Sequence, residues 1–199
     1  YKFSIVTEDD LSTIKSQLLN FDTDIYHSIE WLLLNKDLQE GEIYCIFLED
    51  EKNCAFFPLI KRKIKGTSFF DLITPYGYGG VAFKKNTDIT FKENIFKLLK
   101  DCLSDTNCIS VFLRLHPLLN NNVKESEFVF SNGITLATNL NSSYSDLYSK
   151  YSSGHKYDLK KSKKNENISI VDDIDFIFFD EFIEIYLEIM RYLQATAFY

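Results

Sequence analysis

Three apolar runs followed by a cluster of glycines constrain the fold of this chain more than any other feature. The runs occupy residues 42–48, 54–60 and 67–73, and short polar turns separate them. Runs of this length and composition predict three strands of an antiparallel meander. The segment 74–81, Thr-Pro-Tyr-Gly-Tyr-Gly-Gly-Val, follows at once and holds three of the seven glycines in the chain. It predicts a tight loop at the end of the third strand.

The elements around the meander follow from hydrophobic spacing. Apolar residues three and four apart predict helices over 8–20, 25–34 and 88–104, and apolar runs at 3–6 and 108–115 predict strands. The fold class we predict is α/β of the α+β type, with a mixed, mostly antiparallel sheet flanked by helices.

The last sixty residues differ in composition from the rest. They predict strands at 134–140 and 168–171, a short helix from Ser143, a lysine-rich run at 155–164 and a strong amphipathic helix at 176–193. The apolar run at 195–199 resembles the start of another strand. Because the first residue is Tyr1 rather than Met, we expect the sequence to be a fragment. Because it ends on an apolar run with no partner strand in view, we expect it to end inside a domain.

Composition excludes some classes of function. A formal charge of −7 argues against binding of nucleic acid over the whole surface, although it leaves room for a local basic patch. The four cysteines form no CxxC pair and the three histidines are scattered, so we expect reduced thiols in a cytoplasmic protein and no metal centre. No signal peptide is visible, and no apolar segment approaches the length of a membrane span.

The glycine cluster is the first candidate binding site. Backbone N–H groups of Gly77, Gly79 and Gly80 could face an anion if the loop led into a helix, and the alternative is a plain turn. Tyr76 and Tyr78 could supply a hydroxyl donor or a ring face for a sugar or base. They could equally be core rings whose hydroxyls are satisfied.

Three other groups of residues are candidates. Arg114 and His116 lie at the end of a predicted strand, where ligands gather in open sheets. Arg114 either faces a groove or is a solvent-facing or ion-paired side chain. Lys156 and Lys160 belong to the lysine-rich run, which either contacts phosphate or is a solvated helix face. No residue is singled out as catalytic, since no Ser-His-Asp or Cys-His arrangement is readable.

The order of the predicted elements is similar to that of the GNAT acyltransferase fold. In that fold, a loop and the N-terminus of the next helix hold a pyrophosphate, and the cluster at 77–80 lies at the corresponding place. This sequence departs from the family pattern, because about seven residues separate Gly80 from the predicted helix and the Arg/Gln-x-x-Gly-x-Gly/Ala motif is absent. A coenzyme A pocket is therefore not expected at this loop.

Four motifs, taken in order, resemble the Fem-type (FemABX-like) branch of the GNAT superfamily. They are residues 74–80 (TPYGYGG), 111–117 (VFLRLHP), 153–161 (SGHKYDLKK) and 185–191 (IYLEIMR). The third motif has Lys156 where the family commonly has Arg. Lysine keeps the charge but lacks the bidentate fork that grips phosphate.

The resemblance implies a first GNAT-like domain at 1–140 and the beginning of a second at 141–199. It implies an acyl- or aminoacyltransferase that acts on an amine of a cell-envelope or surface-polysaccharide precursor. The implied donor is acyl-CoA or aminoacyl-tRNA, so tRNA is an implied partner, and no permanently bound cofactor is implied. The alternative is a non-catalytic, degenerate GNAT-like module that binds a sugar or peptide precursor.

Overall fold

A computed structural model describes residues 1–120, 123 and 127–195. The chain divides into two compact units, Tyr1–Thr135 and Leu136–Tyr199. The boundary predicted at 140/141 lies close to this division, and whether the units are the two domains that the resemblance implies stays a prediction.

The first unit contains all the strands found in the described residues. Two four-stranded sheets have the orders β1-β3-β4-β7 and β2-β5-β6-β8, and only β6 and β8 pair in parallel. The α+β class and the mostly antiparallel pairing are therefore confirmed. The strands are β1 (Lys2–Val6), β2 (Glu42–Ile43), β3 (Cys45–Glu49), β4 (Cys54–Phe57), β5 (Ile60–Lys63), β6 (Phe70–Ile73), β7 (Ala82–Phe83) and β8 (Cys108–Phe112).

The two sheets arise from one long hairpin that changes sheet in its middle. Strands β2 and β3 are separated by Tyr44, and β4 and β5 by Pro58 and Leu59. The backbone N–H of Tyr44 donates to the Leu59 carbonyl across the break. The register is the same on both sides, since Ile43 pairs with Ile60 and Ile46 pairs with Phe57. A proline has no N–H for a ladder, which fits its place at the break.

The third strand does not keep this register. Ile60 pairs with Ile73 and Ala55 pairs with Phe83. An advance of five residues, from Ala55 to Ile60, therefore corresponds to ten residues, from Ile73 to Phe83. The excess lies in residues 74–81, between β6 and β7, and it contains the glycine cluster. The glycine loop therefore carries the extra residues at the point where the two sheets separate.

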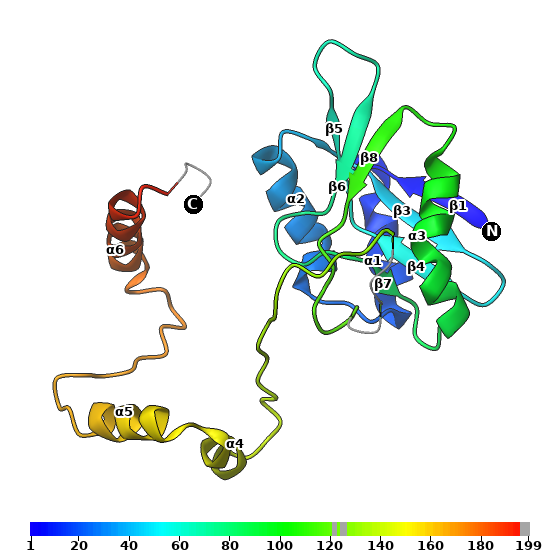
Figure 1. Ribbon diagram of the computed structural model, residues 1–199. Coiled ribbons are helices and arrows are strands. Elements are labelled where there is room, and N and C mark those ends of the chain that lie inside the picture. Colours follow the sequence, from blue (N-terminus) through cyan, green and yellow to red (C-terminus); the bar gives the residue numbers. More distant parts are fainter. Residues whose placement is uncertain (121–122, 124–126, 196–199) are drawn as a thin grey trace. The chain divides into compact units, whose positions relative to one another are not determined.

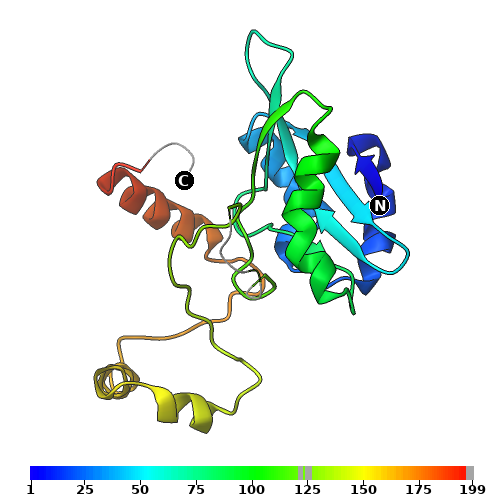
Figure 2. The same cartoon turned by 45° about the vertical axis from the view of Figure 1, so that its right-hand side comes forward.

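Helices cover both faces of the first sheet (Figures 1 and 2). Because successive side chains of a strand point to opposite faces, each strand supplies residues to both cores. Ile46, Leu48, Ala55 and Phe57 share a core cluster with α3 (Ile89–Leu103). Cys45, Phe47, Cys54 and Phe56 share the other cluster with α1 (Leu11–Gln17) and α2 (Ile29–Leu38). Three short 3-10 helices, η1 (Glu8–Asp10), η2 (Leu18–Asn20) and η3 (Ile25–His27), complete the predicted N-terminal helices.

The second unit contains α4 (Tyr144–Lys150), α5 (Ser153–Lys163) and α6 (Phe179–Tyr192). Helices α4 and α6 were predicted, whereas the segment of α5 was predicted only as a lysine-rich run. The strands predicted at 134–140 and 168–171 are wrong, since those residues lie outside helices and strands. Residues 196–199, where a further strand was predicted to start, lie outside the described residues.

Candidate functional site

The glycine loop packs its glycines inward and its tyrosines outward. Gly77, Gly79 and Gly80 are buried, whereas Tyr76 and Tyr78 are 40% and 37% exposed. Gly77 has φ +96°, and a Cβ there would overlap the ring of Tyr26. Gly80 has φ +47°, and a Cβ there would overlap the side chain of Asn120. Both positions therefore need glycine for conformation and for close approach.

The ends of the loop are fixed to the end of β8 and to the segment that follows it. The backbone N–H of Thr74 donates to the Phe112 carbonyl, and the N–H of Gly80 donates to the Arg114 carbonyl at 2.9 Å. Asn120 adds a buried link, because its Nδ2 donates to the Val81 carbonyl at 2.8 Å. This network brings Arg114 and His116, two candidates that the sequence singled out by their place after a strand, against the loop.

The predicted anion cradle is not reproduced at Gly80. Its N–H is used inside the protein, and β7 separates the loop from α3, which begins at Ile89. The loop therefore does not lead directly into a helix N-terminus, as an anion-binding loop of that kind requires.

The candidate site consists of two groups of residues around the glycine loop, and Tyr76 and Arg114 form the first. The guanidinium carbon of Arg114 lies 5.6 Å from the centroid of the Tyr76 ring and 6.0 Å from that of Phe112. These are cation–π distances. The indole N–H of Trp31 donates to the Tyr76 carbonyl at 2.8 Å, which ties the loop to α2.

Tyr78 and His116 form the second group of the candidate site. Their ring centroids are 6.4 Å apart, and the Tyr26 ring lies 5.9 Å from Tyr78 and 6.3 Å from His116. The buried His116 ring bonds through both nitrogens. Its Nδ1 accepts the backbone N–H groups of Leu118 and Leu119, each at 3.1 Å. The proton therefore resides on Nε2, which donates to Asp24 Oδ2 at 3.2 Å.

Asp24 connects two histidines, His27 and His116, which are far apart in the sequence. Its backbone N–H donates to His27 Nδ1 at 3.1 Å, while its carboxylate holds His116. The carboxylate also accepts the N–H of Tyr26 at 3.2 Å and caps η3. The Asp24 side chain is 35% exposed, so one residue combines two fixed internal bonds with access to solvent.

His27 is the most deeply buried polar residue of the site, with 1% exposure. Burial lowers the pKa of His27 to about 4, and the neighbouring His116 acts in the same direction. The backbones of Asp24 and Gly79 act more weakly in the opposite direction. Within the described residues, Nε2 has no partner that meets the geometry of a hydrogen bond. The ring is thus neutral at physiological pH.

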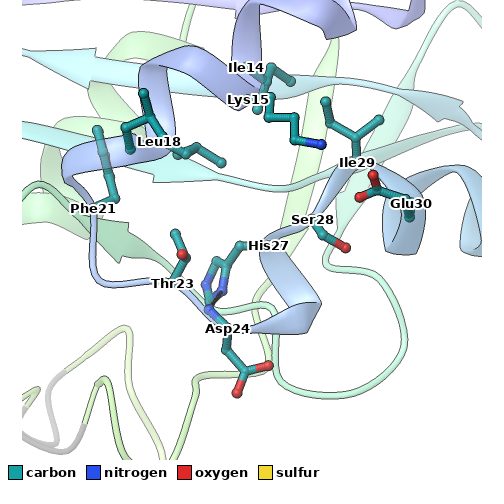
Figure 3. A pocket seen from close by; sticks show the side chains of 11 residues that line it. Ile14, Lys15, Leu18, Phe21, Thr23, Asp24, His27, Ser28, Ile29 and Glu30 are labelled. Carbon is teal, nitrogen blue, oxygen red and sulfur yellow. Dashed lines mark hydrogen bonds between the residues drawn. The ribbon is translucent and has the colours of Figure 1, made fainter.

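A pocket of about 350 Å³ lies on the side of Asp24 and His27 that faces α1 (Figure 3). Figure 3 shows apolar side chains, among them Leu18 and Phe21, opposite the His27 ring, while the Asp24 carboxylate points away from them. Its lining residues are Ile14, Lys15, Leu18, Leu19, Phe21, Thr23, Asp24, His27, Ser28, Ile29 and Glu30. None of the site residues predicted from the sequence lines this pocket.

Lys156 and Lys160, the remaining predicted residues, lie on α5 in the second unit. Lys156 is half-buried, its ammonium group donates to the Ser149 carbonyl at 2.8 Å, and it lies 5.6 Å from the centroid of Tyr148. Lys160 is exposed. Lys156 thus has a structural partner within its own unit, which weakens the prediction that it contacts phosphate.

Sequence reasoning missed Asp24, Tyr26, His27, Trp31 and Asn120. A signal for two of them was present: Asp-x-x-His at 24–27 is the spacing of a reciprocal cap at the start of a helix, and the structure forms that cap. No local pattern links Asp24 to His116, because 92 residues separate them.

Several other features bear on chemistry. All four cysteines are free; Cys45 and Cys54 are buried, and burial raises their pKa values to about 12 and about 11. Across the part of the chain that the structure describes, no three His, Cys, Asp or Glu side chains gather as metal ligands would. No helix within that part combines the length and the apolar character needed to cross a bilayer.

Comparisons with protein-family models, with curated proteins and with solved structures gave no match.

Proposed function

We propose that this chain forms part of an N-acyl- or aminoacyltransferase of the Fem/GNAT type, which acts on an amine of a cell-envelope or surface-polysaccharide precursor. One observation carries the proposal. Asp24 presents a partly exposed carboxylate beside Tyr26, whose ring packs against that of Tyr78, and hydrogen bonds from His116 and from the Tyr26 backbone fix its orientation. A carboxylate beside aromatic rings suits an ammonium group.

The fold supports the same assignment. A strand, helices, an antiparallel meander, a glycine loop, a helix and a further strand follow one another in the order expected from the resemblance. The candidate site lies at the split, where the glycine loop and the end of β8 come together.

The chemistry assigned to the site is direct transfer. Asp24 holds the acceptor ammonium and takes its proton, and the amine nitrogen then attacks the acyl carbon. The C–S bond of acyl-CoA or the ester C–O bond of aminoacyl-tRNA breaks. The leaving sulfur or oxygen takes the second proton that the amine nitrogen loses as the amide forms, and Asp24 releases the first proton to solvent. The Tyr78 hydroxyl is a candidate donor to the carbonyl oxygen as charge develops there. Cys45 and Cys54 are unsuited to a covalent route, because a raised pKa disfavours the thiolate.

The test is a transfer assay with a peptidoglycan precursor that carries a free amine. Acetyl-CoA and aminoacyl-tRNA are supplied in separate reactions, and the product is followed by mass spectrometry. Asp24→Asn should lower kcat/KM by about 100-fold or more, because a positioned proton acceptor is lost. Asp22→Asn removes the same charge from an exposed side chain close by, and should leave the rate unchanged.

The proposal is wrong if neither donor gives product, or if the two variants have the same activity. The second candidate, a binding-only module, is favoured by one observation. Both nitrogens of His116 and the N–H of Gly80 are already bonded within the protein, which leaves few groups free to act in a reaction. Calorimetric binding of the precursor without turnover would support this module, and turnover with either donor would exclude it.

A further inference from the structure

Arg114 differs from the other arginine of the first unit. Arg62 forms a bidentate pair with Asp71, with donor–acceptor distances of 2.9 and 2.8 Å. Arg114 has no carboxylate within ion-pairing distance among the described residues, and its guanidinium makes one long hydrogen bond, from Nη1 to the Gly77 carbonyl at 3.5 Å. The chain has 29 acidic and 22 basic residues, so an arginine without a carboxylate partner is unexpected.

The Arg114 side chain is nevertheless held in place. Its backbone N–H donates to Thr74 Oγ1 at 3.1 Å, and its carbonyl accepts the N–H of Gly80. The guanidinium lies over the rings of Tyr76 and Phe112, which are 40% and 54% exposed. A planar cation fixed over rings loses less conformational entropy on binding than a free side chain does.

We propose that Arg114, supported by Tyr76 and Phe112, binds an oxyanion, either a phosphate or a carboxylate. The guanidinium has donors left over in the fork geometry that such groups accept. The inference rests on the proposed function in one respect: it assigns the oxyanion to the substrate of that site. The chain contains only three arginines, Arg62, Arg114 and Arg191, which makes the assignment directly measurable.

The experiment is an NMR titration that follows the Nε–Hε signals of the three arginines in ¹⁵N-labelled protein. Inorganic phosphate, pyrophosphate and acetate are the probes, and sodium chloride at equal ionic strength is the reference. We expect a saturable shift of the Arg114 signal, with Arg62 and Arg191 unchanged. Saturation at lower concentration with the phosphates identifies a phosphate site, and saturation at lower concentration with acetate identifies a carboxylate site.

Variants of Arg114 test whether binding needs the guanidinium fork or only the positive charge. Arg114→Lys keeps the charge but loses the fork, and should weaken binding by about 10-fold, as measured from backbone amide shifts of the glycine loop. Arg114→Gln should abolish the saturable shifts. Arg191→Gln removes the same charge from α6 in the second unit and should leave them intact. Because Arg114→Lys preserves the stem and the charge, it keeps the test valid if Arg114→Gln fails to fold.

Two results would overturn the inference: an Arg114 signal that moves no more with the probes than with sodium chloride, or Arg114→Lys that binds as tightly as the parent. The outcome is separate from that of the transfer assay, because the titration measures binding alone. Anion binding without transfer would leave Arg114 as a recognition residue of a binding module.

Discussion

Helices α3 and α6 have the same kind of sequence and opposite surroundings. Both are amphipathic helices of similar length, in the first and second units respectively. Helix α3 buries Phe91, Ile95, Leu99 and Leu103 in the core of its unit. Helix α6 buries none of its residues, and none of the described residues from 136 to 195 is buried. Apolar spacing thus specifies a helix and the face it will bury, but a core also needs an opposing surface.

The largest effect we expect comes from removing a core ring in the first unit. Phe56 is fully buried on β4, and Phe56→Ala should lower the free energy of unfolding by about 3–5 kcal/mol, since it removes buried surface and leaves a cavity. Phe182→Ala on α6 is the matched change, and should cost less than about 0.5 kcal/mol because that ring is 59% exposed. Urea unfolding measures both. Equal losses would show that α6 is packed in solution as α3 is.

A second effect concerns pH. The pKa of His27 is lowered to about 4 in the folded protein, so the unfolded chain binds more protons between pH 4 and the ordinary pKa of about 6.5. Stability is therefore fully present above pH 6.5 and falls as the pH is lowered to 4, by about 3 kcal/mol from this residue. Urea unfolding at a series of pH values should show this slope, and His27→Gln should remove that part of it.

The histidine of the second unit provides the control. His155 is exposed, so His155→Gln should leave the pH dependence as it is in the parent protein. A parent slope that survives in His27→Gln would mean that the carboxylates alone cause it.

A third effect tests the glycines. Gly80→Ala should destabilise the protein by about 1–3 kcal/mol, because the position has φ +47° and the new Cβ would lie 2.9 Å from the His116 nitrogen. Gly154→Ala in α5 has no heavy atom within 4 Å of the new Cβ and should gain up to about 1 kcal/mol of helix propensity. Thermal unfolding distinguishes the two. A neutral Gly80→Ala would mean that the loop can rearrange without loss.

The smallest effect concerns the start of α5. The Ser152 hydroxyl accepts the N–H of His155 at 3.2 Å, so Ser152→Ala should cost the helix about 1 kcal/mol. Circular dichroism should record a small loss of helix, while the urea midpoint of the first unit stays fixed. A shift in that midpoint would show that the two units unfold together.

The parts of the fold that the sequence predicted are those that depend on local pattern. The meander, the helices and the glycine loop each follow from spacing within about a dozen residues. The strands predicted at 134–140 and 168–171 have suitable β-branched residues, but the structure gives them no partner strand. Strand propensity describes a residue that fits into a sheet, and it says nothing about whether a sheet is present. The two-residue strand β7 was too short to leave a pattern.

The candidate site was predicted in part for the same reason. Tyr76, Gly77, Tyr78, Arg114 and His116 stand out because they follow strands, and the structure does bring them together. Their partners Asp24 and Trp31 come from the N-terminal helices, and only the three-dimensional fold places them there. Lys156 and Lys160 stood out by charge alone, and charge does not specify a location.

The shared register of the first hairpin has a consequence for how this protein can vary. A slip of one residue along the β4–β5 side of the hairpin would turn Phe57 in β4 and Ile60 in β5, which lie in different sheets, to their opposite faces at once. Length changes there would disrupt both sheets together. The glycine loop at 74–81 lies outside this ladder, so a change of length there would leave the register of the hairpin intact.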